Sequence, residues 1–305
     1  MAIALVLLVP GISGTVPTPK SCATGSNPSD PAYDPVHHYI YVPDYFSNEI
    51  QVYKGTCTLV HTFVFGNSST PNMAAFDPQN NFVYVTDTTL NCVYALRGTS
   101  LIGTITGFSG PVGIAFDPGD GIMLVTNYYS TNVTEISGLY SGPNITVGYN
   151  AIGINYDPYF DTMIVDNWRS SSVTILNASL PTNPNYGTFS IPAGAYFSAF
   201  NPNTDLDYIV NDASPGGVSV ILGTGTFYFN LTLPAYPTSI AFSPVHLEMY
   251  AANYVSNSVS VISGGSVVKT IKFPGGSDPF GMTYDDANNV MFVTGSGNGR
   301  LYELH

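Results

Sequence analysis

The sequence predicts an all-β protein, a closed ring of seven four-stranded sheets, because one unit recurs along the chain. The first observation is a triplet of an aromatic residue, then Asp, Asn or Ser, then usually Pro. Its aromatic members are Tyr33, Phe76, Phe116, Tyr156, Phe200, Phe242 and Tyr284. The second observation is the period, since successive triplets are 43, 40, 40, 44, 42 and 42 residues apart. A period of about 40–45 residues is typical of one propeller blade. Seven copies therefore predict a seven-bladed β-propeller.

The clearest copy of the unit shows why each blade is expected to hold four strands. Residues 113–116, 122–126 and 133–136 are short, β-prone runs, and 144–147 offers a fourth. The turn between the first two runs is the Asp-Pro-Gly-Asp-Gly segment that begins at Asp117. A second polar column closes the second strand of each blade. Its members are expected to be Asp44, Asp87, Asn127, Asn167, Asp212, Asn253 and Gly295.

The other blades follow in chain order from the same apolar, β-branched runs between turn residues. Blade 1 takes 32–33, 39–42, 50–53 and 58–65, and blade 2 takes 73–76, 82–86, 93–96 and 101–106. Blade 4 takes 152–156, 162–165, 173–176 and 186–191, and blade 5 takes 197–200, 208–210, 218–221 and 227–233. Blade 6 takes 239–242, 249–252, 259–262 and 267–273. Blade 7 has only 281–284, 291–294 and 301–304, so it lacks a fourth strand.

The ends of the second strands resemble a known repeat family. Val125-Thr126-Asn127, Val85-Thr86-Asp87 and Tyr41-Val42-Pro43-Asp44 are similar to the signature of YVTN-type β-propeller repeats. The resemblance covers residues 31–305, which we take as the propeller domain. It implies the seven-bladed fold, and proteins with such repeats include cell-surface and S-layer-associated proteins. The same fold serves lactonase-like enzymes and a nitrous oxide reductase domain, so the resemblance selects no activity.

The unpaired edge of blade 7 predicts that an N-terminal strand completes it, because sheet edges are normally covered. Residues 1–30 comprise an apolar run followed by a linker rich in Pro, Gly, Ser and Thr. Ala2 to Val9 is the candidate strand, although the same run also fits the remnant of a secretion signal. The strand would close its own blade or, by strand addition, a neighbour's. The second geometry would join subunits into a polymer or filament.

The charge composition of the chain excludes one class of binding partner. The chain has 7 Lys and Arg against 20 Asp and Glu, a net charge of −13. Nucleic-acid partners are therefore not expected, because phosphate backbones require clustered basic residues. The apolar run is too short for a transmembrane helix, so no membrane span is expected.

Three cysteines and five glycosylation sequons bear on the compartment. Cys22, Cys57 and Cys92 match no metal pattern, so they are either free thiols or, in an exported protein, include one disulfide. Cys22 and Cys57 are the better pair because both lie in loop-like contexts. Sequons that permit glycosylation stand at Asn67, Asn132, Asn144, Asn177 and Asn230.

No catalytic or metal site is expected from the sequence. The predicted innermost strands of blades 2 to 7, which would line the axial channel, contain no His, Asp, Glu, Lys or Arg. The five histidines show no ligand spacing. Calcium between Asp30, Asp44 and Asp278 is the weaker alternative to turn-stabilising roles for these carboxylates. We therefore expect no catalytic residue, metal or cofactor.

One set of aromatic residues does suggest a binding surface. Tyr45, Phe46, Tyr128, Tyr129, Trp168 and Tyr254 follow the second column directly, on one face of the propeller. Exposed aromatics on one face indicate a contact surface for protein or glycan, with packing between loops as the alternative. The sequence thus predicts an exported, non-catalytic cell-surface or extracellular protein that binds or self-associates. The alternative is a lactonase- or lyase-like propeller enzyme.

Overall fold

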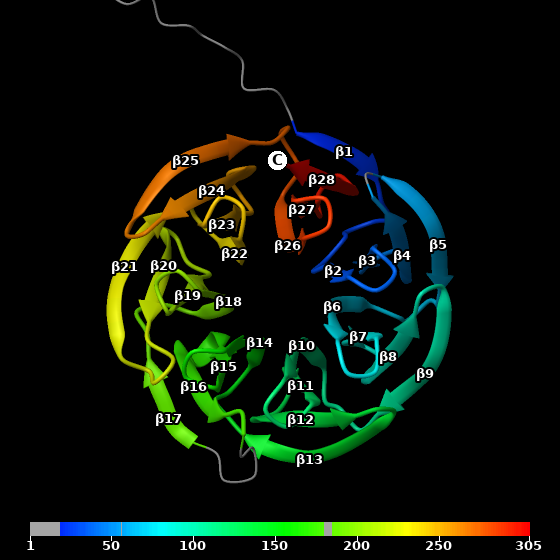
Figure 1. Cartoon of the computed structure of the whole chain (residues 1–305), viewed down its shortest axis with the longest axis horizontal. Coiled ribbons are helices and arrows are strands. Elements are labelled where there is room, and N and C mark those ends of the chain that lie inside the picture. The colour runs from blue at the N-terminus through cyan, green and yellow to red at the C-terminus, as the bar shows by residue number, and fades with distance from the viewer. Residues whose placement is uncertain (1–18, 56, 180–184) are drawn as a thin grey trace, which may run out of the picture.

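The protein is a closed ring of seven four-stranded antiparallel sheets around a central axis (Figure 1). The computed structural model describes residues 19–55, 57–179 and 185–305. Within these residues the one helix is η1 (Trp168–Ser170), a single 3-10 turn. No helix in the described ranges is long and apolar enough to cross a membrane. The predicted all-β, seven-bladed propeller is confirmed.

The strands of each blade run in chain order from the axis outward. Blade 1 consists of β2 (Ala32–Asp34), β3 (Tyr39–Asp44), β4 (Glu49–Lys54) and β5 (Thr58–Val64). Blade 2 consists of β6 (Pro71–Asp77), β7 (Phe82–Asp87), β8 (Cys92–Arg97) and β9 (Ser100–Thr106). Blade 3 consists of β10 (Pro111–Asp117), β11 (Ile122–Asn127), β12 (Asn132–Ser137) and β13 (Tyr140–Thr146).

The next three blades repeat this order. Blade 4 consists of β14 (Ala151–Asp157), β15 (Thr162–Asn167), β16 (Ser172–Asn177) and β17 (Asn185–Ser190). Blade 5 consists of β18 (Ala195–Asn201), β19 (Leu206–Asn211), β20 (Gly216–Ile221) and β21 (Phe227–Leu233). Blade 6 consists of β22 (Pro237–Ser243), β23 (Glu248–Asn253), β24 (Ser258–Ser263) and β25 (Ser266–Lys272).

Blade 7 is completed by the chain's own N-terminal region. It contains β26 (Pro279–Asp285), β27 (Val290–Gly295) and β28 (Arg300–Leu304), and its outermost strand is β1 (Lys20–Ala23). Strand β1 pairs antiparallel with β28, from Lys20 opposite Glu303 to Ala23 opposite Arg300. An N-terminal strand therefore closes the ring in cis, and strand addition from a neighbour is not needed at this edge.

The prediction that Ala2 to Val9 supplies this strand is wrong. That segment lies outside the described residues, and Lys20–Ala23, which the sequence suggested as linker, occupies the outer position of blade 7. The outer strands of this propeller are largely exposed, as in β13, where only Ile145 is buried. An outer strand therefore has no need of an apolar sequence, and the most apolar run was a poor guide.

A disulfide fixes the closing strand. Cys22 on β1 is bonded to Cys57 in the β4–β5 turn, with 5.4 Å between the two Cα atoms. This is the pair named from the sequence, while Cys92 is a buried free thiol. The bond links blade 7's outer strand to blade 1, across the seam where the ring closes. A loop of 35 residues closed in this way stabilises the folded chain by about 3–4 kcal/mol.

Apolar side chains between neighbouring blades form the core. Each cluster joins two blades, as where Val93 and Ile105 of blade 2 pack with Met123 and Val125 of blade 3. Buried tyrosines on second strands complete the fit, because each finds a hydrogen-bond partner for its hydroxyl. The Tyr84 hydroxyl donates to the Gly138 carbonyl at 2.8 Å in the next blade. The aromatic members of the repeated triplet lie half-buried at the margins of these clusters.

Candidate functional site

Seven equivalent residues surround one mouth of the central channel, and we call them the rim positions. Each follows the last residue of a second strand and donates its backbone N–H to the carbonyl of the loop that enters the same blade. In blade 3, for example, Tyr128 donates to Gly110 at 2.9 Å. The rim positions are Tyr45, Thr88, Tyr128, Trp168, Asp212, Tyr254 and Ser296.

This equivalence corrects one member of the second polar column. The column residue of blade 5 is Asn211, because its amide donates to the Ser219 hydroxyl at 2.9 Å. The Asn167 amide bonds Thr174 at the same distance in blade 4. Asp212 is thus one residue further on, at the rim position, where four other blades carry Tyr or Trp. Asn211 and Asp212 are adjacent, and both are residue types found in the column, so the sequence alone did not show which of them belongs to it.

A second set of equivalent residues lies just inside the rim and forms what we call the throat ring. In each blade, the residue that pairs with the column residue is followed directly by a throat-ring residue. Pro111 pairs with Asn127 in blade 3, for example, and Ala195 pairs with Asn211 in blade 5. The throat ring comprises Ser29, Asn72, Val112, Ile152, Tyr196, Thr238 and Phe280. All seven line one or both of two cavities at this mouth.

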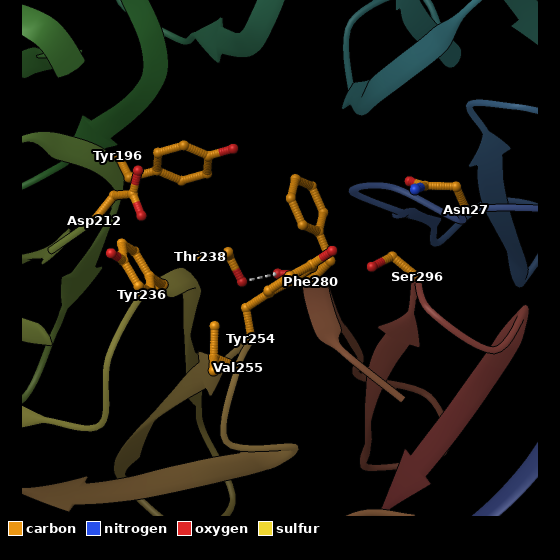
Figure 2. Close-up of a pocket in the computed structure, with 9 residues that line it drawn as sticks. All are labelled: Asn27, Tyr196, Asp212, Tyr236, Thr238, Tyr254, Val255, Phe280 and Ser296. Carbon is orange, nitrogen blue, oxygen red and sulfur yellow. Dashed lines mark hydrogen bonds between the residues drawn. The ribbon is translucent and has the colours of Figure 1, made fainter. Parts of the chain in front are cut away.

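The two cavities form one funnel, because both are lined by Asn27, Tyr196 and Phe280. The larger, of about 410 Å³, is also lined by Asp212, Tyr236, Thr238, Tyr254, Val255 and Ser296 (Figure 2). Tyr196 and Asp212 project from blade 5 at one side of the opening, with Asn27 and Ser296 at the other. The smaller cavity, of about 230 Å³, includes Tyr45 and Phe46 among its walls. Loops and inner strands of several blades therefore build a single hollow on the axis.

Aromatic rings in mutual contact form the wall of the funnel on the side of blades 3 to 7. The Trp168 ring lies 6.3 Å from that of Tyr128 and 6.0 Å from that of Tyr196. Phe280 follows at 6.4 Å from Tyr196 and 6.4 Å from Tyr254. The last three contacts have interplanar angles of 89°, 90° and 80°. Neighbouring walls thus stand nearly perpendicular to one another.

The aromatic residues named from the sequence fall on or beside this funnel, and none is fully buried. Tyr45, Phe46 and Tyr254 line it, Trp168 packs against the lining residue Tyr196, and Tyr128 packs against Trp168. Tyr129 is largely exposed, packs edge-on against Tyr128, and is not part of the lining. Sequence reasoning missed Tyr196 and Phe280, because they lie at inner-strand starts that the period alone placed too late.

Within residues 19–55, 57–179 and 185–305, Asp212 carries the one carboxylate that lines either cavity. Burial raises the pKa of Asp212, and a hydrogen bond from the Trp168 side chain opposes that rise. The pKa of Tyr196 is raised as well, first by burial and then by the charges of Asp212 and Asp30. No Lys, Arg or His is among the lining residues. The funnel therefore pairs a proton acceptor with tyrosine hydroxyls in a partly dehydrated, negative environment.

A second carboxylate, Asp30, lies one residue below the throat ring. Its Oδ1 accepts the Met282 N–H at 3.2 Å and the Ser239 hydroxyl at 3.4 Å, so it links blades 1, 6 and 7. Burial raises the pKa of Asp30 to about 7, against these two hydrogen bonds. Its Oδ2 has no hydrogen-bond partner. Asp30 precedes the inner strand of blade 1, which begins at Ala32, so it lies outside the strands in which the sequence showed no ionisable residue.

Two further buried carboxylates lie between blades 4 and 5. Asp166 stands where Thr86 and Thr126 stand in blades 2 and 3, and it accepts the Ser198 hydroxyl at 2.7 Å. Burial raises the pKa of Asp166 to about 7. Burial also raises the pKa of Asp207, whose Oδ1 accepts from Asn155 at 2.9 Å. The threonines instead tie neighbouring inner strands together, as in the 2.8 Å bond from Thr86 to the Val112 carbonyl.

The structure does not bring Asp30, Asp44 and Asp278 together as a calcium site. Within the described ranges no group of three or more His, Cys, Asp or Glu side chains could hold a metal ion. His37 and His246 lie at first turns, where His37 contacts Asp34 at 2.7 Å. Among the residues that the structure describes, no histidine lines the funnel.

Comparison with known proteins supports the fold. No family model matches the chain, and no curated protein matches it in sequence. Among solved structures, a catalytically inactive histidine-to-alanine variant of virginiamycin B lyase from Staphylococcus aureus, solved with quinupristin, has a TM-score of 0.81. It is 11% identical and the match covers 93% of this chain and 97% of that one. Selenomethionine-substituted virginiamycin B lyase from the same organism gives 0.80 at 10% identity, and a streptogramin B lyase gives 0.77 at 12%. Both of these matches also cover 93% of this chain and 97% of the other.

The class of protein defined by fold and comparison is a seven-bladed β-propeller. Membership of the YVTN-type repeat family is not shown, since no family model matches. The prediction of a non-catalytic surface protein is corrected, because the three similar solved structures named above, which match nearly the whole chain, are lyases. The sequence test covered the predicted inner strands alone, and Tyr196 and Asp212 lie outside those strands.

Proposed function

We propose that the protein is an enzyme of the lyase kind that carries out proton-transfer chemistry in the funnel. The observation that carries the proposal is Asp212, a half-buried carboxylate at a rim position where blades 3, 4 and 6 hold aromatic residues. A carboxylate whose pKa is raised by burial is a stronger base than one in water, so it is suited to accept a proton near neutral pH. The lyase structures with the same fold support this class of reaction.

The reaction that fits these groups is an elimination. The Asp212 carboxylate takes a proton from a carbon atom, the released electron pair forms a C=C bond, and the bond to the leaving oxygen or nitrogen breaks. The leaving atom finally takes up the proton held by Asp212, directly or relayed through water, which restores the free enzyme. The Tyr196 hydroxyl keeps its proton, because its pKa is raised, and it donates a hydrogen bond to developing negative charge. The aromatic walls exclude water from the substrate.

The proposed reaction differs in detail from that of the similar lyases. The virginiamycin B lyase solved with quinupristin is a catalytically inactive variant in which alanine replaces a histidine, whereas no histidine lines this funnel. We therefore assign the base to Asp212 and expect a different substrate. Quinupristin remains the natural first probe, because that lyase was solved with it.

The experiment is an assay of the purified full chain with quinupristin and a panel of cyclic and acyclic esters, read by mass spectrometry. Elimination leaves the summed mass of the products equal to that of the substrate, whereas hydrolysis adds the mass of one water. We expect products of unchanged mass, and we expect Asp212→Asn to lower kcat by about 100-fold or more. The control is Asp161→Asn at the opposite face. Hydrolytic products, no turnover of any panel member, or full activity in Asp212→Asn would contradict the proposal.

We further propose that the enzyme is exported and belongs among YVTN-type propellers. Three observations support export to an oxidising compartment: the Cys22–Cys57 disulfide, the net charge of −13, and sequons with exposed asparagines at Asn67, Asn144 and Asn230. The Val-Thr-Asn and Val-Thr-Asp endings of β11 and β7 support the repeat family, since their threonines bond to the next blade. Glycosidase treatment and mass analysis of protein from its native host test the sequons.

A further inference from the structure

The funnel has a box-like aromatic wall with one acidic group, and this combination matches a particular ligand chemistry. Trp168, Tyr196, Phe280 and Tyr254 meet edge to face, so their ring faces enclose space on more than one side. Tyr236, which is 43% exposed, adds a ring from the loop that enters blade 6. A flat sugar ring would call for an open, single-faced platform. Perpendicular walls instead suit a compact, rounded group.

The charges around the box favour a cation. Asp212 stands at a rim position between Trp168 and Tyr254, since blades 4, 5 and 6 are neighbours in the ring. None of the residues that line the funnel is basic. Aromatic faces attract cations through the negative potential above each ring, and Trp and Tyr do so most strongly. The protein's net charge of −13 would also raise the rate at which a cation arrives.

One contact already shows that the wall accepts a positive charge. The guanidinium of Arg169 lies over the Trp168 ring, 5.1 Å from its centroid. Arg169 itself is exposed and is not among the residues that line the funnel. The indole therefore already carries one cation, and it packs nearly perpendicular to the lining residue Tyr196. A substrate cation would accordingly rest on Tyr196, Tyr236, Tyr254 and Phe280 more than on Trp168.

We propose that the funnel binds substrates bearing an alkylammonium group, held among Tyr196, Tyr236, Tyr254 and Phe280 beside the Asp212 carboxylate. This inference rests on the proposed function for the claim that the ligand is a substrate, but the binding itself can be tested without turnover. The cavity of about 410 Å³ exceeds the size of a trimethylammonium group, so the remaining space takes the reacting part of the molecule. The positive charge beside Asp212 would also draw the base towards its ionised form.

The experiment measures binding of choline to the full chain by calorimetry, with 3,3-dimethylbutan-1-ol as the neutral molecule of the same shape. We expect choline to bind about tenfold more tightly than the neutral analogue. Tyr254→Leu should remove most of that preference, and Tyr254→Phe, which keeps the ring face, should retain it. Tyr159→Leu is the matched control, because Tyr159 is an exposed tyrosine in a first turn at the opposite end of the channel.

A pH series separates charge recognition from simple apolar binding. The groups that face Asp212 are Trp168, Tyr196, Tyr236 and Tyr254, with Arg169 beyond the indole and Asp30 deeper in the channel. Choline affinity should rise as pH rises through the titration of Asp212, and Asp212→Asn should remove this dependence. Equal affinities for the two probes, no choline binding, or an equal loss in Tyr159→Leu would overturn the inference.

The two proposals can fail separately. Choline binding without turnover of any ester would leave the cation site standing and contradict the enzyme. Turnover of neutral esters by a protein that does not bind choline would support the enzyme and contradict the cation site. Competitive inhibition by choline, lost in Tyr254→Leu, would support both at once.

Discussion

The two ends of the central channel are built from the same repeat but differ in how closely the blades keep to it. At one end, the turns between first and second strands carry Asp in five blades and Asn or Ser in the other two. The Asp and Asn side chains accept hydrogen bonds from backbone N–H groups two residues on, as Asp117 does from Gly119 at 2.9 Å. At the other end, the rim positions read Tyr, Thr, Tyr, Trp, Asp, Tyr and Ser.

The difference separates residues that hold the fold from residues that give the protein its chemistry. A turn that every blade must make demands the same hydrogen bonds each time, so its residue types recur. The rim and throat positions make their repeated bonds through backbone atoms, and their side chains are left free to vary. Asp212, Tyr196 and Phe280 are therefore candidates for function, because the fold requires no particular side chain at their positions.

The largest expected effect on stability comes from pH and concerns the buried carboxyls. Burial raises the pKa of Asp30, Asp117 and Asp166 to about 7 and that of Asp44 to about 8, all from 3.8. The folded state therefore binds more protons than the unfolded state between about pH 4 and pH 8. Stability should be fully present below about pH 4 and fall as pH rises through the folded pKa values, by several kcal/mol in total.

Urea unfolding at pH 4, 6 and 8 measures this trend. Asp166→Asn should flatten the curve and raise the free energy of unfolding at pH 8 relative to the wild type. Asp120→Asn, at an exposed turn residue, serves as the control. A protein that becomes more stable from pH 4 to pH 8 would show that these carboxyls are ionised in the folded state.

Removing the disulfide at the seam comes next in size. Cys22→Ser combined with Cys57→Ser should lower the free energy of unfolding by about 3–4 kcal/mol, because the unfolded chain regains the freedom of a 35-residue loop. Urea titration of the double variant against the wild type measures it. Choline binding at the funnel should be retained in the double variant. An unchanged urea midpoint would contradict the prediction and would mean that β1 is held by its pairing with β28 alone.

A smaller effect is expected at the repeated turns. Asp77→Ala removes the acceptor of the Gln79 N–H at 2.8 Å and of the Asn80 amide at 2.7 Å. The free energy of unfolding should fall by about 1–3 kcal/mol, since two donors lose their partner. Asp120→Ala, at an exposed turn position, should change it by less than about 0.5 kcal/mol. Thermal melts of the two variants side by side decide whether repeated turn residues carry stability.

The sequence was sufficient for the parts of the molecule that repeat. Seven triplets such as Phe116-Asp117-Pro118 predicted the number of blades, and the second column marked where second strands end. The closing strand could not be found in this way, because Lys20–Ala23 belongs to no repeat and its outer position imposes no apolar pattern. The disulfide partner Cys22 was a better indicator of that strand than hydrophobicity was.

The sequence predicted only part of the candidate site, because the repeat locates some of its residues and not others. Aromatic rim residues such as Trp168 and Tyr254 stood out because they follow the column directly. Asp212 did not, because Asn211 and Asp212 are both acceptable column residues and only the bonds to Ser219 and Gly194 distinguish them. Tyr196 required the inner-strand pairing of Ala195 with Asn211, which the spacing alone does not give.

The most direct measurement compares two carboxylates of neighbouring blades, Asp212 at the rim and Asp157 at a turn of the opposite end. Asp157 accepts the Tyr159 N–H at 2.8 Å, whereas Asp212 lines the funnel. Turnover and thermal midpoint are measured for Asp212→Asn and Asp157→Ala on the best substrate of the panel. Asp212→Asn should keep the wild-type midpoint and lose about 100-fold or more in kcat, and Asp157→Ala, which removes the acceptor, should melt earlier and retain kcat. A fully active Asp212→Asn, or a loss of kcat in Asp157→Ala of the same size, would contradict the assignment of function to the varying end of the channel.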